Sequence, residues 1–82
     1  MEIKPLRPDL IKFLKKHNLL KRFEKQSKLF CQNPSYPSLK TERLEPKQFK
    51  IYSFRIDRKY RAVFILSSSN LAEIVDINLH YQ

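Results

Sequence analysis

Three stretches in the second half of the chain decide the fold: Tyr52-Ser-Phe-Arg-Ile56, Tyr60-Arg-Ala-Val-Phe64 and Glu73-Ile-Val-Asp-Ile-Asn-Leu-His-Tyr81. In the first stretch apolar and polar residues alternate, so Phe54 points to one face of a strand while Ser53 and Arg55 point to the other. The second stretch is apolar on both faces, which is typical of a central strand. Polar turns at 57–59 and 67–70 separate three consecutive strands, the last over 71–79.

The first half of the chain predicts a short strand and two helices. Residues 2–6 can form an edge strand, where Pro5 is tolerated. Asp9 is the expected N-cap of a helix that ends at Asn18, and a second helix begins near Leu19 and stops at Asn33-Pro34. The apolar faces of these helices are Leu10, Ile11, Phe13 and Leu14 in the first, and Leu20, Phe23, Ser27, Phe30 and Cys31 in the second.

The elements together predict a single α+β domain over residues 1–82, in the order β-α-α-β-β-β. Residues 33–38 are expected to be loop, and the stretch 39–46 fits an irregular strand or a turn. The strands and helices of so small a domain must share one interior. The expected core members are Leu20, Phe23, Tyr52, Phe54, Phe64 and Ile74.

Composition favours a polyanionic partner. The 82 residues carry a formal net charge of +9, which suits nucleic acid, an acidic protein segment or an anionic membrane surface. A single cysteine excludes an internal disulfide and fits a reducing cytoplasm. No stretch reaches transmembrane length, and the absence of glycine excludes the Gly-rich phosphate loops. The chain is therefore expected to be a soluble cytoplasmic protein.

Arg55 and Arg61 flank the turn between two antiparallel strands, where their guanidinium groups can hold one phosphate between them. The alternative is that each pairs with a carboxylate and only stabilises the hairpin; the candidates are Asp57, Glu73 and Asp76. The sequence also offers Glu42 and Glu45 as general bases, without separating them. His80 and Tyr81 are adjacent, so a regular strand would point them to opposite faces.

Other chemistry finds less support. Two histidines and one cysteine complete no metal-ligand set, so no metal is expected. Cys31 lies on an apolar helix face and is a poor candidate nucleophile. Between Lys12 and Lys28, however, seven basic residues face one acid, which favours phosphate contacts. The residues expected to bind nucleic acid are Lys21, Arg22, Lys25, Arg55, Arg58 and Lys59.

Residues 33–39 (NPSYPSL), the YSFRI and YRAVF hairpin and the EIVDINLHY strand resemble the RelE/ParE superfamily of bacterial toxins from toxin–antitoxin systems. The final His-Tyr pair is most similar to the YoeB branch. The resemblance implies a twisted antiparallel sheet covered on one face by a helical hairpin. It also implies a ribonuclease site of Glu42, Arg61, His80 and Tyr81, with Arg55 binding phosphate.

The implied activity is cleavage of mRNA in the ribosomal A site without a cofactor. Its implied partners are mRNA, the ribosome and a cognate acidic antitoxin, with no membrane. Two alternatives stay open: a ParE-like toxin that binds DNA gyrase without chemistry of its own, and an inactive relic that only binds an antitoxin.

Overall fold

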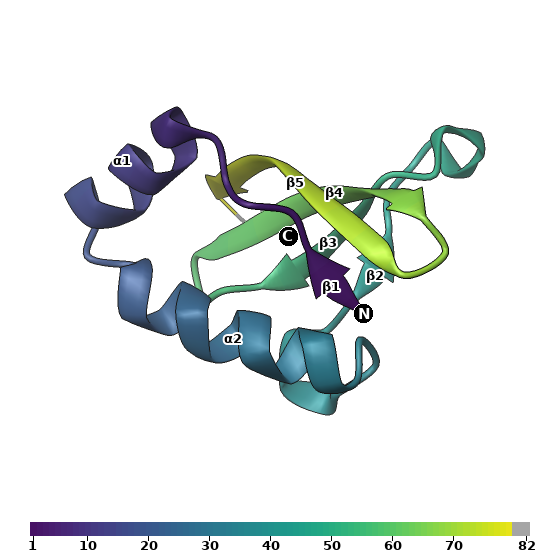
Figure 1. Ribbon diagram of the computed structural model, residues 1–82, viewed down its shortest axis with the longest axis horizontal. Helices are drawn as coiled ribbons and strands as arrows, with labels where there is room; N and C mark the ends of the chain where they lie inside the picture. The colour runs from purple at the N-terminus through teal and green to yellow at the C-terminus, as the bar shows by residue number, and fades with distance from the viewer. Residues whose placement is uncertain (80–82) are drawn as a thin grey trace.

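The computed structural model describes residues 1–79 and forms a five-stranded sheet with two helices (Figure 1). The elements in chain order are β1 (Glu2–Ile3), α1 (Pro8–Lys16), α2 (Leu20–Gln32), the 3-10 turn η1 (Pro37–Leu39), β2 (Glu42–Arg43), the 3-10 turn η2 (Lys47–Phe49), β3 (Tyr52–Arg55), β4 (Tyr60–Ser68) and β5 (Leu71–Leu79). The predicted class and the order of the main elements are confirmed.

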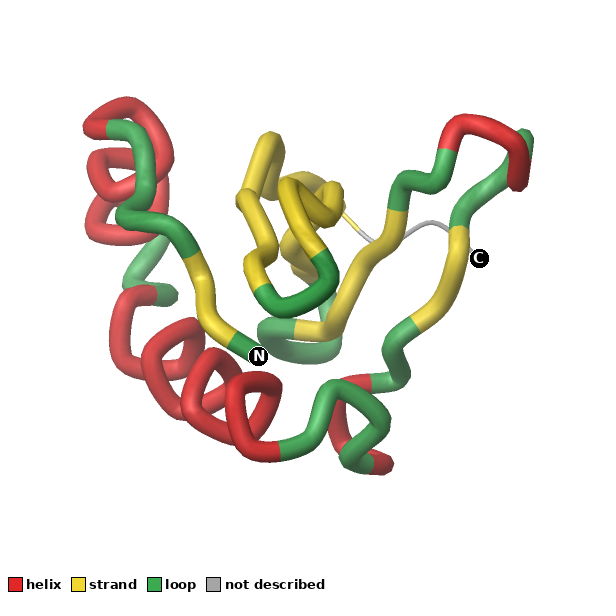
Figure 2. Tube along the Cα trace, turned by 45° about the vertical axis from the view of Figure 1, so that its right-hand side comes forward, coloured by secondary structure: helices red, strands yellow, loops and turns green. Residues whose placement is uncertain are grey.

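The sheet has the strand order β1-β5-β4-β3-β2, so the predicted central strand, β4, lies in its middle. Three neighbouring pairs are antiparallel, whereas β1 runs parallel to β5. Both helices lie on the same side of the sheet (Figure 2). Neither helix in the described part of the chain combines the length and the apolar run that crossing a bilayer requires.

The prediction that Asp9 caps α1 is wrong, because the helix begins two residues earlier. Arg7 occupies the N-cap position without a side-chain cap, and Pro8 is the first helical residue. Proline suits that position, since its fixed φ fits the helix and its missing N–H has no partner there to lose. Asp9 instead accepts two hydrogen bonds from the Arg7 guanidinium. These bonds hold the pKa of the Asp9 carboxyl below its usual value.

The boundary between the two helices lies where the sequence predicts it, but Leu19 takes the core position that was predicted for Leu20. Asn18 takes a left-handed backbone with φ 55°, which ends α1. The Leu19 N–H donates to the Leu14 carbonyl, and Leu19 becomes fully buried, while Leu20 is only partly buried at the edge of the core. Phe23, Phe54, Phe64 and Ile74 are buried as predicted, and Tyr52 packs partly buried against them.

A bulge in β5 decides which of its side chains face the core. Phe64 pairs with Ile74 but Val63 pairs with Asp76, so Val75 is an extra residue in the strand. Strict alternation would place Ile74, Asp76 and Asn78 on one face. The bulge reverses the alternation after Ile74. Ile77 therefore joins the core, and Asp76 and Asn78 turn to the opposite face, which we call the open face.

The stretch that the sequence left ambiguous contains two similar backbone turns. The turns η1 and η2 each end in a lysine with a left-handed backbone, Lys40 at φ 45° and Lys50 at φ 54°. Between them, β2 pairs with only two residues of β3, which is too short for an alternating pattern to reveal. Residues 44–51, which we call the lobe, connect β2 to β3 and project from the end of the sheet (Figure 1).

Candidate active site on the open face of the sheet

The open face gathers polar side chains from three neighbouring strands. Glu42 lies opposite Ser53 across the β2–β3 pair, and Arg55 lies opposite Arg61 across the β3–β4 pair. With Lys40 these residues line a pocket of about 150 Å³, which we call the sheet pocket. Three of its five lining residues are cationic, so the sheet pocket suits a small anionic group such as one phosphate.

Arg61 on β4 is held in place by partners on either side of it, one on β2 and one on β5. Its Nη1 donates to Oε1 of Glu42 at 3.2 Å, and its Nε donates to Oδ1 of Asn78 at 3.4 Å. Asn78 in turn donates from Nδ2 to Asp76. The Arg61 side chain is only 19% exposed, whereas the Glu42 side chain is 53% exposed. A pair this open adds little stability, so its main effect is to orient the guanidinium.

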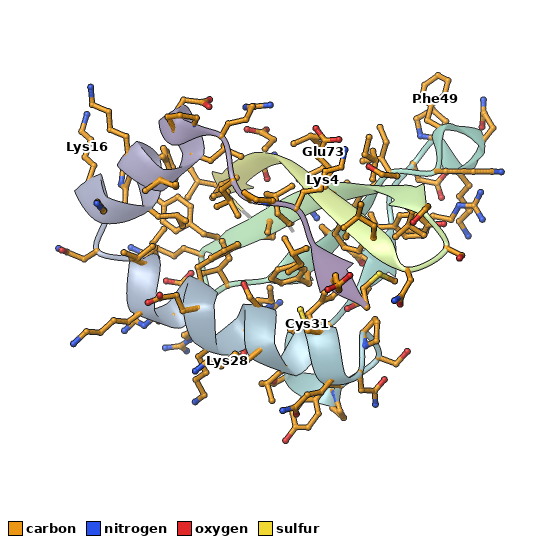
Figure 3. The ribbon with its side chains drawn as sticks, viewed as in Figure 1. Lys4, Lys16, Lys28, Cys31, Phe49 and Glu73 are labelled. Carbon is orange, nitrogen blue, oxygen red and sulfur yellow. The ribbon has the colours of Figure 1, made fainter. Side chains whose placement is uncertain are left out.

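The carboxylates that the sequence offered to the two arginines have other partners. Asp57 pairs with Arg22. Glu73 pairs with Lys4, the residue that follows β1 (Figure 3). Arg61 contacts neither of them and binds Glu42 instead. Among residues 1–79 the Arg55 guanidinium makes no ion pair. The alternative that Arg55 and Arg61 each pair with Asp57, Glu73 or Asp76 and only stabilise the hairpin is therefore wrong.

The structure distinguishes Glu42 from Glu45 as candidates for the general base. Glu42 lies on β2 and reaches Arg61 on the open face, two strands away. Glu45 lies at the start of the lobe, exposed, and has no hydrogen bond to another side chain within the described part of the chain. Only Glu42 thus lies where a carboxylate could act together with Arg61.

A second and larger hollow lies beside the sheet pocket, and Arg55 lines both. This basic pocket has a volume of about 810 Å³ between α2 and the turn from β3 to β4. Its basic residues are Arg22, Lys25, Arg55, Arg58 and Lys59, five of the six residues predicted to bind nucleic acid. The sixth, Lys21, lies on α2 outside this pocket and lines a separate hollow together with Lys25 and Lys28.

The floor of the basic pocket is apolar, and its one carboxylate is already engaged. Leu19, Ile56 and Tyr60 contribute apolar surface. Asp57 accepts hydrogen bonds from the backbone N–H groups of Lys59 and Tyr60 in addition to its ion pair with Arg22. The pocket therefore presents excess positive charge around an apolar base, a combination that suits a nucleotide of a single-stranded nucleic acid.

Gln26 is a structural support of the site that the sequence did not reveal. It is buried on α2, and its Nε2 donates to the backbone carbonyl of Arg55 at 2.7 Å and to that of Ser38 at 3.4 Å. One side chain thus ties α2, the loop around η1 and the end of β3 together. The sequence could not predict these contacts, because both acceptors are backbone carbonyls that lie far from Gln26 along the chain.

Replacing Gln26 by alanine is expected to lower the free energy of unfolding by about 1–3 kcal/mol, because two backbone carbonyls lose their donor. Urea denaturation followed by circular dichroism measures this change. Gln32→Ala is the matched control, since Gln32 is exposed on the same helix and should change stability by at most about 0.5 kcal/mol. Equal effects of the two substitutions would contradict the role given to Gln26.

Two of the four predicted catalytic residues, His80 and Tyr81, lie outside the described residues. Of the other two, the structure brings Glu42 and Arg61 into contact. It adds Lys40, Ser53 and Asn78 to their surroundings. Asn78 could have been suspected from the sequence, because it shares one face of the last strand with Asp76. Nothing in the sequence indicated that Lys40 would line the site.

Comparison with solved structures finds the same fold throughout. A YoeB/ParE toxin from Agrobacterium tumefaciens superposes with a TM-score of 0.73 at 20% identity, covering 99% of this chain and all of that one. A YoeB dimer from Staphylococcus aureus gives 0.71 at 22% identity, and a heterotetrameric YoeB-YefM toxin–antitoxin complex from the same organism gives 0.69 at 22%. Each of these two alignments covers 98% of this chain and 94% of the Staphylococcus aureus chain.

No protein-family model matches the sequence, and no curated protein matches it at significant similarity. The likeness is therefore one of architecture, over nearly the whole chain. It agrees with the fold that the hairpin and last-strand motifs implied. The chain has the fold of the YoeB/ParE toxins.

Proposed function

We propose that this protein is the toxin of a toxin–antitoxin pair and that it cleaves mRNA on the ribosome, in the cytoplasm. The observation that carries the proposal is the contact between Glu42 and Arg61 beside Arg55, in a pocket sized for one phosphate. Arg55 makes no ion pair among residues 1–79. A carboxylate and two guanidinium groups are a suitable set for phosphoryl transfer from RNA. The fold shared with YoeB toxins makes this chemistry the best-supported choice.

RNA carries its own nucleophile, so the proposed reaction needs a base, an acid and cations. The 2′-oxygen of one nucleotide attacks the adjacent phosphorus, and the 5′-oxygen of the next nucleotide leaves. Glu42 accepts the proton of the 2′-hydroxyl. Arg61 and Arg55 stabilise the negative charge that builds on the phosphoryl oxygens in the transition state. His80 supplies a proton to the leaving oxygen, and Tyr81 orients a base; both roles rest on the family resemblance.

The basic pocket extends the proposed substrate path. Because Arg55 lines both hollows, a strand whose reacting phosphate occupies the sheet pocket can continue past Arg55 into the basic pocket. Arg58, Lys59, Arg22 and Lys25 would then contact successive phosphates. Such contacts carry no sequence information, so this surface would add affinity for any RNA strand and for ribosomal RNA.

Primer extension on mRNA from cells induced to express the protein tests the activity. We expect new 5′ ends within translated regions, together with growth arrest, and their loss when translation is blocked beforehand. Intact transcripts with inhibited DNA supercoiling would move the protein to the gyrase-binding class. Intact transcripts with normal growth would identify an inactive relic. Either result would refute the ribonuclease.

The partner that fits this surface is a small acidic antitoxin. One solved neighbour is a YoeB-YefM toxin–antitoxin complex, and the net charge of +9 here calls for a partner of opposite sign. We expect an amphipathic acidic segment to cover Arg55 and Arg61 and so to block the sheet pocket. Affinity purification from the native host should recover an acidic protein in stoichiometric amount; recovery of the free monomer alone would contradict this expectation.

A further inference from the structure

The lobe displays an aromatic side chain for which the proposed reaction has no use. Phe49 is 61% exposed, the highest value among the large hydrophobic side chains of residues 1–79. Figure 3 shows its ring standing at the outer end of the lobe, away from the sheet. The ring therefore contributes nothing to the core, and water surrounds most of it.

The backbone beneath Phe49 is well braced. The Leu44 N–H donates to the Ile51 carbonyl at 2.7 Å and closes the neck of the lobe. Arg43 donates from Nε to the Lys47 carbonyl at 2.9 Å, and the Phe49 N–H donates to the Pro46 carbonyl at 3.1 Å. These bonds fix the 3-10 turn that carries the ring, so little conformational freedom is lost when a partner binds it.

The residue after Phe49 is held in an unfavourable conformation. Lys50 has a left-handed backbone with φ 54°, a region that costs any residue with a Cβ atom free energy relative to glycine. The only other lysine with this backbone in the described part of the chain is Lys40, which lines the sheet pocket. Such strain is typical of functional positions, and here it falls on the lysine that directly follows the exposed Phe49 in sequence.

The surroundings of Phe49 favour a nucleic acid over a protein partner. A protein interface surrounds its aromatic anchor with further apolar surface, whereas the exposed neighbours of Phe49 are Lys47, Gln48 and Lys50. An aromatic ring between cations matches the way single-stranded nucleic acids are bound, with bases on rings and phosphates on basic groups. The lobe also joins β2 to β3, the two strands that bring Glu42, Ser53 and Arg55 to the sheet pocket.

We propose that the lobe is a stacking platform for one unpaired RNA base. The ring of Phe49 stacks on the base, and Lys47 and Lys50 bind the phosphates on either side of it. The inference rests on the proposed function in one respect, because it takes the bound strand to be the RNA that enters the sheet pocket. It adds a second contact to that strand, outside the reacting nucleotide.

The test uses the full chain and a single-stranded 2′-O-methyl RNA that contains one 2-aminopurine. The methyl group removes the nucleophile, so the strand binds without being cleaved. We expect the wild-type protein to quench the fluorescence of the stacked 2-aminopurine. Phe49→Ala should abolish the quenching and weaken binding by roughly 5- to 150-fold, while Phe49→Trp should retain both. Lys50→Gly keeps the left-handed backbone and removes only the cation, so it should weaken binding and leave the quenching in place.

The outcomes separate this inference from the proposed ribonuclease. No quenching by the wild-type protein, or unchanged quenching and affinity in Phe49→Ala, would overturn the platform even if mRNA is cleaved in cells. Quenching that depends on Phe49, in a protein that cleaves no mRNA, would support the platform and refute the ribonuclease. If Phe49→Ala binds RNA normally but no longer binds its antitoxin, the lobe is a protein-binding surface and the inference is wrong.

Discussion

Replacing Arg61 by alanine is expected to slow mRNA cleavage by about 100- to 1000-fold. The Arg61 side chain is only 19% exposed, and Glu42 and Asn78 hold its guanidinium in a fixed direction. A donor that is positioned before the reaction stabilises transition-state charge without reorganising. The variant also leaves Glu42 without its cation. The measurement is cleavage of a ribosome-bound message by the purified protein.

Arg7→Ala is the matched control, because it removes the same charge from an exposed arginine at the start of α1. It should cleave at close to the wild-type rate, which separates the loss of a catalytic group from a lower net charge. Arg61→Lys should recover only part of the activity, since lysine lacks the fork that reaches Glu42 and Asn78 together. Cleavage that persists in a folded Arg61→Ala protein would place the active site elsewhere.

The longer strands were predictable from the pattern of their side chains. Apolar and polar residues alternate with a period of two over residues 52–56, and residues 60–66 form a β-rich run that is apolar on both faces. The two-residue strand β2 shows no such period, and its pairing with β3 depends on the loop before it. Leu19 replaced Leu20 in the core for a similar reason: the position depends on how tightly the chain turns at Asn18, which no periodicity records.

The site was predictable only in part, because it depends on register. The sequence predicted that Arg55 and Arg61 flank the turn on neighbouring antiparallel strands, and in the structure the two residues pair directly across these strands. It did not place Asn78 beside Arg61, because that contact requires the bulge at Val75. Glu42 was indicated by family resemblance rather than by pattern. Gln26 donates to backbone carbonyls, and Lys40 reaches the sheet pocket from a left-handed backbone turn. Neither feature can be predicted from the pattern of side-chain types.

Truncating Phe54 to alanine is expected to cost about 3–5 kcal/mol of folding free energy. Phe54 is 0% exposed and stacks on Phe23 from α2, with ring centroids 6.2 Å apart, and on Phe30 at 5.0 Å. It also lies 5.9 Å from Phe64 on β4. Its removal leaves a cavity where both layers meet. Domains of this size have a total stability of about 4–12 kcal/mol, so the variant loses a large fraction of it.

Phe49→Ala is the matched control for this loss, because it makes the same chemical change on a side chain that is 61% exposed. Thermal and urea denaturation should shift strongly for Phe54→Ala and hardly at all for Phe49→Ala. The same pair also separates folding from binding, since Phe49→Ala should lose RNA affinity in a protein of normal stability. A comparable loss of stability in both variants would mean that the lobe packs into the fold, and the stacking platform would then lose its basis. A small loss in Phe54→Ala would show that the two layers close over the cavity, which the ring contacts on three sides of Phe54 argue against.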